Sequence, residues 1–197
     1  DPVWIGRLSS LVARGRAAVV GSQPPAWREF VEFFVRRFPA AVYRSWRWWV
    51  PVALITIAVS TGLGAWIATH PEIQATIATP AEIRDMTRAG GQFEDVYSSG
   101  PASAFAGHVW VNNALAAAGC LFLGVLIVPV IWILWGNVVN VAIGGGLMAA
   151  VGRLDVFFGL ITPHGLLELT AVFVAAGAGL RLGWTVIDAG RGRRAER

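Results

Sequence analysis

The amino-acid sequence predicts an all-α protein: a polytopic transmembrane helical bundle of about four spans, preceded by an interfacial amphipathic helix. Composition is the first reason, because 55% of the residues are hydrophobic and 14% are charged, whereas roughly a quarter of a typical soluble domain is charged. The second is distribution, because residues 96–152 contain no Asp, Glu, Lys or Arg, and a helix needs about 20 apolar residues to span the hydrocarbon core. A soluble fold could not cover so much apolar surface.

Residues 1–47 are expected to form a basic segment at the membrane surface. Residues 1–22 predict an Arg-rich amphipathic helix that ends before Pro24-Pro25, and apolar side chains recur at helical spacing over 26–38 with charged residues between them. A helix of this kind fits the headgroup layer, although a helix of a small soluble domain would have the same pattern. The residues expected at the membrane interface are Trp27, Phe30, Phe34, Arg36, Arg37, Trp46, Trp48 and Trp49.

The transmembrane domain is expected over residues 48–186. We predict spans at about 48–69, 103–127, 130–151 and 163–186, with a turn near Pro129 or at Gly136-Asn137, and a short connection over 153–162. Thr79-Pro80-Ala81-Glu82 predicts one short helix within the loop 70–103, because Thr is a good cap, Pro suits the first helical position and Glu faces the positive helix end.

Arginine distribution predicts the orientation. Eight arginines precede the first span and four lie in the tail 187–197, whereas the loop 70–103 has two arginines against five acidic residues. Because basic segments stay on the cytoplasmic side, both ends of the chain are expected in the cytoplasm and the loop outside a bacterial plasma membrane. The basic charge lies beside the spans and accompanies no nucleic-acid-binding motif, so its expected partner is the lipid bilayer.

Polar side chains three or four residues apart lie in each of the last three spans, on one face of each helix. Because polar groups in hydrocarbon normally turn inward, they could meet inside the bundle. They could hydrogen-bond between helices, line a path for a proton or solute, or form a metal or catalytic site. We favour the first interpretation and expect no metal ligands or cofactor. This intramembrane polar cluster comprises His108, Asn112, Asn113, Asn137, Asn140, His164 and Glu168.

Small residues predict close helix contacts. Ala171, Ala175, Gly179 and Gly183 recur at four-residue intervals in the last span, and Gly144-Gly145-Gly146 precedes Ala149 in the span before it. These surfaces could pack within one protomer or between protomers of a homo-oligomer. Hydrolase motifs such as Gly-x-Ser-x-Gly and His-Glu-x-x-His do not occur in the sequence, so we expect no catalytic residue and no enzymatic activity.

One segment carries a resemblance to a known family. Four features of the sequence together resemble the stage II sporulation protein M family. They are His164-Gly165-Leu166-Leu167-Glu168-Leu169, the triplet Val111-Asn112-Asn113, the pair Asn137 and Asn140, and the span ending Gly179-Leu180-Arg181-Leu182-Gly183. The similarity covers roughly residues 25–186, and the Arg-only, Ala-rich composition is similar to the actinobacterial branch. Two features differ: members often have Asn-Gly where this chain has Asn140-Val141, and related chains continue with further apolar spans, so we expect a truncated or cleaved product.

The resemblance implies a non-enzymatic scaffold or anchor in a cell-envelope complex. In spore-forming bacteria, the namesake of the family is a membrane component that acts with peptidoglycan-degrading partners in engulfment. Other membrane or envelope proteins would therefore be the partners of this chain. The alternative function is a transport component with a polar intramembrane path lined by His108, Asn112, Asn140, His164 and Glu168.

Overall fold

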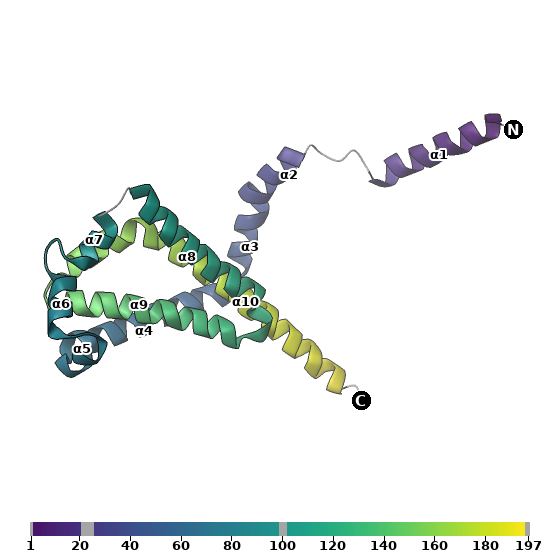
Figure 1. The fold of residues 1–197 in the computed structure, drawn as a ribbon. Helices are drawn as coiled ribbons and strands as arrows, with labels where there is room; N and C mark the ends of the chain where they lie inside the picture. Colours follow the sequence, from purple (N-terminus) through teal and green to yellow (C-terminus); the bar gives the residue numbers. More distant parts are fainter. Residues whose placement is uncertain (1, 21–25, 99–101, 196–197) are drawn as a thin grey trace. The chain divides into compact units, whose positions relative to one another are not determined.

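The computed structural model of this 197-residue chain describes residues 2–20, 26–98 and 102–195. Within these ranges it leaves out the side chains of residues 2, 13, 16–20, 26, 97, 98, 102–106, 108, 164 and 189–195. The described elements are all helical (Figure 1), which confirms the predicted all-α class. The chain divides into two compact units, Asp1–Arg44 and Ser45–Arg197, and the boundary lies close to the predicted boundary at 47/48.

The first unit contains the predicted basic helices. Helix α1 is Pro2–Val20, within the segment 1–22 that the sequence predicted to be helical. The second helical run consists of α2 (Ala26–Glu32), a π-helical segment η1 (Phe33–Arg37) and α3 (Phe38–Arg44). It continues beyond the predicted end at residue 38.

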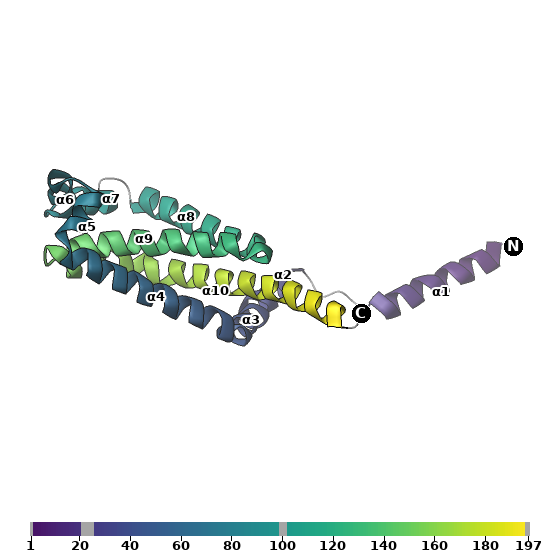
Figure 2. The ribbon, with the colours of Figure 1, turned by 90° about the horizontal axis from the view of Figure 1, so that it is seen from below.

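The second unit contains four long helices and a group of short ones. The long helices are α4 (Trp46–Thr69), α8 (Ala102–Phe122), α9 (Val128–Ala150) and α10 (Leu154–Ala195). All four extend lengthwise in Figure 2, but Figure 1 shows α8 and the later part of α10 inclined to α4 and α9. The short helices α5 (Pro71–Ile77), α6 (Pro80–Thr87) and α7 (Gln92–Ser98) gather at one end of the unit. We call α5–α7 the cap.

Helix ends follow local sequence signals at two places. Thr79 and Glu82 form a capping box at the start of α6, with Thr79 N–H donating to Glu82 Oε2 at 2.8 Å and Glu82 N–H donating to Thr79 Oγ1 at 3.3 Å. The turn between α8 and α9 contains the 3₁₀ segment η2 (Gly124–Leu126), and Pro129 lies in the first turn of α9. The predicted turn near Pro129 is therefore confirmed, whereas Gly136-Asn137 lies inside α9 and the alternative turn there is wrong.

Helix α10 differs most from expectation. The connection predicted over 153–162 is wrong, because the helix begins at Leu154 and Pro163 lies inside it. Proline has no N–H to donate to the carbonyl of Gly159 and kinks a helix without necessarily ending it. The earlier, light green part of α10 is accordingly inclined to its later, yellow part in Figure 1.

Glycines allow the long helices to approach each other closely. A Cβ on Gly146 of α9 would lie 2.8 Å from the Gly64 carbonyl oxygen of α4. A Cβ on Gly179 of α10 would lie 2.1 Å from the Cys120 carbonyl oxygen of α8, and one on Gly183 would lie 2.5 Å from the Gly124 carbonyl oxygen. Small residues therefore let these backbones touch within one protomer.

Among the described residues, three helical segments are long and apolar enough to cross a membrane: α4, α9 and Gly165–Asp188 of α10. The second predicted span corresponds to α8, whose described apolar part is Val109–Phe122. A multi-helical membrane protein is thus the fold, and the count of four spans stays a prediction.

Candidate functional site

The Glu168 carboxylate lies in the part of α10 that is long and apolar enough to cross a membrane, and it pairs with helix α8. Asn113 Nδ2 of α8 donates to Glu168 Oε2 of α10 at 2.6 Å, and also to the Val109 carbonyl oxygen of its own helix at 3.0 Å. An amide nitrogen has two hydrogens to donate, so Asn113 uses both. Both side chains are half-buried, and this hydrogen bond joins helices at residues 55 positions apart in the sequence.

No hydrogen bond to this pair is described for the other members of the predicted polar cluster whose side chains the structure includes. Asn112 is exposed. His108 lies in α8 and His164 lies in α10, but both side chains are outside the described set. The structure therefore brings together Asn113 and Glu168 from this cluster and leaves the predicted histidine contacts untested.

Asn137 and Asn140 of α9 line different cavities, so the predicted pair does not share one environment. Asn137 lies on a cavity of about 450 Å³ between α4, α9 and α10, whose walls are mainly apolar; its amide nitrogen donates to the Ile133 carbonyl oxygen at 3.1 Å. Asn140 lies on a cavity of about 270 Å³ between α9 and the cap, beside Gln92 and Phe93.

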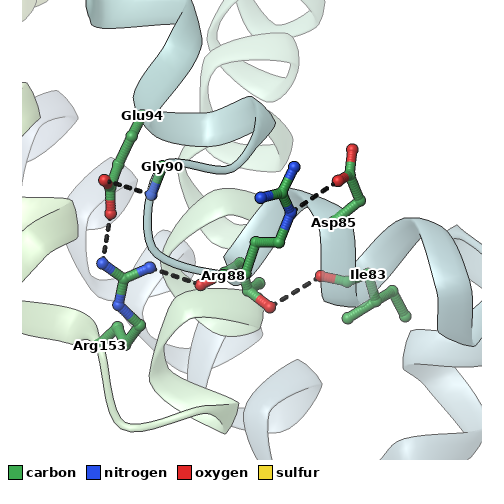
Figure 3. A network of polar contacts seen from close by, with 7 residues as sticks. Ile83, Asp85, Arg88, Gly90, Glu94 and Arg153 are labelled. Atoms are coloured by element: carbon green, nitrogen blue, oxygen red, sulfur yellow. Dashed lines mark hydrogen bonds and ion pairs between the residues drawn. The ribbon is translucent and has the colours of Figure 1, made fainter.

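The cap is tied to the turn between α9 and α10 by Arg153 (Figure 3). The Arg153 guanidinium pairs with the Glu94 carboxylate of α7, and its Nη1 donates to the Thr87 carbonyl oxygen of α6 at 2.6 Å. The Gly90 N–H donates to the second oxygen of Glu94 at 2.9 Å. Arg153 and Glu94 are about one-quarter exposed, so this network joins all three segments at a partly dehydrated position.

Electrostatics at this network favour the charged form of Glu94. The hydrogen bond from the Gly90 N–H, followed by the bond from Arg153, lowers the pKa of Glu94 from its ordinary value of 4.5. Ring packing supports the same junction, because Phe157 of α10 stacks on Phe93 of α7 with centroids 5.7 Å apart. The Phe157 ring also contacts Gly144 and Gly145, where a Cβ would lie 3.1 Å and 3.3 Å from it.

A family model for stage II sporulation protein M matches residues 53–197, which include the helices α4–α10 except for the start of α4. The chain belongs to the stage II sporulation protein M family. The predicted resemblance is confirmed. Searches against curated proteins and against solved structures find no match to this chain.

The family match includes every residue of the polar cluster and leaves the N-terminal unit outside it. It also includes the predicted small-residue face, whose members differ in burial: Ala171 is exposed, Ala175 is half-buried, and Gly179 and Gly183 are buried. Among the described side chains, no three His, Cys, Asp or Glu residues gather closely enough to hold a metal ion.

Sequence reasoning did not identify Arg153 and Glu94 as site residues. The sequence did indicate an ion pair between Arg153 and the loop 70–103, because Arg153 is the only charged residue between Asp95 and Asp155 and the loop is acidic. The partner within that loop could not be chosen from spacing, since the loop contains five acidic residues: Glu72, Glu82, Asp85, Glu94 and Asp95.

Proposed function

We propose that this member of the stage II sporulation protein M family is a non-enzymatic membrane scaffold, or anchor, of a bacterial cell-envelope complex. The observation that carries the proposal is the hydrogen bond between Asn113 and Glu168. A carboxylate at membrane depth marks either a conduction path or a structural contact. Here the carboxylate accepts a hydrogen bond from the adjacent helix, which favours a role in holding α8 and α10 together.

The cap is the surface proposed to meet partners. The glycine faces at Gly64, Gly146, Gly179 and Gly183 are occupied by contacts within the protomer, so they do not need a second chain. The cap is held to the bundle by Arg153 and presents exposed polar residues on α5 and α6. In the proposed orientation, with both basic ends cytoplasmic, the cap faces the envelope, where peptidoglycan-degrading proteins are candidate partners.

The alternative is a transport component, and the cavity beside Asn137 is the feature that favours it. Substitution of Glu168 with Gln separates the two functions, because the amide is nearly the same size as the carboxyl and its carbonyl oxygen can still accept from Asn113. The purified full chain and E168Q would be reconstituted into liposomes for measurements of proton flux and of thermal unfolding. A scaffold predicts unchanged unfolding and no flux above empty liposomes in either protein.

A matched pair of variants tests the structural role. Asn113→Leu should destabilise the bundle by about 0.6 kcal/mol and at most about 1.7 kcal/mol, the range measured for interhelical hydrogen bonds within membrane proteins. Asn112→Leu, at an exposed position of the same helix, should change stability little. Proton or solute flux through the wild-type chain that disappears in E168Q would contradict the scaffold and support transport.

A further inference from the structure

The helical run α2–η1–α3, Ala26–Arg44, carries an exposed aromatic face. Four phenylalanines contact one another along it: the Phe30 and Phe34 ring centroids lie 4.7 Å apart, those of Phe33 and Phe34 lie 5.1 Å apart, and those of Phe33 and Phe38 lie 6.1 Å apart. Their exposed fractions range from 45% to 65%, and Trp27, one turn earlier, is 63% exposed. Aromatic surface of this extent calls for an apolar partner.

The π-helical segment sets the register of this face. In a regular α-helix, Arg37 would follow Phe33 by one turn and lie on the same side. The π-helix instead places residues five apart above one another, as the bond from the Phe38 N–H to the Phe33 carbonyl oxygen shows. Arg37 consequently pairs with Glu32, with its Nη2 3.3 Å from Glu32 Oε1. The wider turn thus keeps the phenylalanines together and moves the guanidinium away from them.

Charge on the run identifies the partner. Arg28, Arg36, Arg37 and Arg44 outnumber Glu29 and Glu32. The Arg28 guanidinium lies over the Trp27 ring at 5.5 Å from its centroid, an arrangement that combines an apolar ring with a cation, as at a membrane–water interface. Arginines beside an aromatic face complement an apolar layer that is bordered by negative charge.

Chain connectivity brings this run to the bilayer. Only Ser45 separates Arg44 from Trp46, where the apolar helix α4 begins. We propose that Ala26–Arg44 is an in-plane helix that binds the surface of an anionic bilayer, with its phenylalanine face in the headgroup–acyl boundary and its arginines on lipid phosphates. The π-helical segment is the device that aligns the two sets of side chains.

Spin labels on the full chain in liposomes test the proposal. In a Cys120→Ser background, single labels would be placed at Phe34→Cys, in the aromatic cluster, and at Glu32→Cys, an exposed position on the opposite side of the helix. Collisions with oxygen, which concentrates in lipid, and with a water-soluble nickel chelate report the depth of each label. Vesicles would contain phosphatidylcholine alone or with phosphatidylglycerol. We expect oxygen to dominate at position 34, the nickel chelate to dominate at position 32, and phosphatidylglycerol to increase the membrane-bound fraction.

Two variants test separately how the arginine charge and the alignment of the aromatic face contribute to membrane binding. Arg36→Gln with Arg37→Gln should lower the ratio of bound to detached helix in phosphatidylglycerol vesicles by about fivefold for each arginine neutralised, with little change in phosphatidylcholine. Deletion of Val35 should preserve binding, because removing the extra residue restores an α-helix in which Phe33 and Phe38, and Glu32 and Arg37, are one turn apart.

Three outcomes would overturn the proposal. Equal access of the nickel chelate to positions 34 and 32 in both lipids would show that the helix does not enter the bilayer. Protection of position 34 from both reagents would show that protein covers the aromatic face. Binding that is the same in both lipids, and unaffected by the arginine substitutions, would remove the role of anionic phosphate.

Discussion

Substitution of Gly179 by Ala tests the close contact between α8 and α10. The added Cβ would lie 2.1 Å from the Cys120 carbonyl oxygen and 3.1 Å from the Gly124 Cα. Because carbon and oxygen normally approach to about 3.3 Å, and the obstructing atoms are backbone, the helices would have to separate by roughly 1 Å. Overpacking of this kind costs about 1–3 kcal/mol, from which about 1 kcal/mol is recovered by the higher helix propensity of Ala.

Gly136 provides the matched control. It lies in α9, where a Cβ would meet no atom within 4 Å, so Gly136→Ala should stabilise the chain by up to about 1 kcal/mol through helix propensity alone. Equilibrium unfolding of the full-length variants in mixed micelles, with increasing dodecyl sulfate, measures both changes. Gly179→Ala should unfold at a lower detergent fraction than wild type and Gly136→Ala at an equal or higher one. Equal stability of the two variants would refute the packing argument.

Three further predictions concern the cap. Arg153→Gln should lower the stability of α6 and α7 by about 1–3 kcal/mol, because it removes charged hydrogen bonds to Thr87 and Glu94. Hydrogen exchange over residues 80–95 should therefore become faster. Unchanged exchange would contradict the role of Arg153. Because the pKa of Glu94 is lowered in the folded chain, its stabilisation is present above its ordinary pKa of 4.5 and is lost as pH falls through the lower folded value. The protection of the cap amides, taken relative to the intrinsic exchange rate at each pH, should therefore fall below about pH 4.5, and it should fall less steeply in Glu94→Gln. Thr79→Ala should destabilise α6 by about 1 kcal/mol through loss of the capping box, detected as faster exchange in α6; equal exchange would show that the cap is held elsewhere.

Local signals in the sequence were sufficient for much of the fold. The capping box at Thr79 and the turn before Pro129 were predicted because the residues that form them are neighbours in the chain. The small-residue spacing identified Gly179 and Gly183 as contact positions, although it could not determine whether the contact lay within one protomer.

Features that depend on distant residues or on competing helix geometries were not predicted. The pairing of Arg153 with Glu94 joins residues 59 positions apart, and no periodicity encodes it. Pro163 is compatible with either a helix start or a kink, and the apolar residues before it let α10 continue through it. The pattern of apolar residues over Phe33–Arg37 is compatible with a regular α-helix, so the sequence did not predict its π-helical geometry.

Photo-crosslinking from the cap in native membranes tests the scaffold most directly. A crosslinking side chain at Arg84, an exposed position of α6, would report protein contacts, and one at Ile55, an exposed apolar position of α4, would serve as the lipid-facing control. The scaffold predicts a discrete protein adduct from position 84, present equally in wild type and Glu168→Gln, and no such adduct from position 55. Absence of a protein adduct from the cap, together with solute flux that requires Glu168, would contradict it.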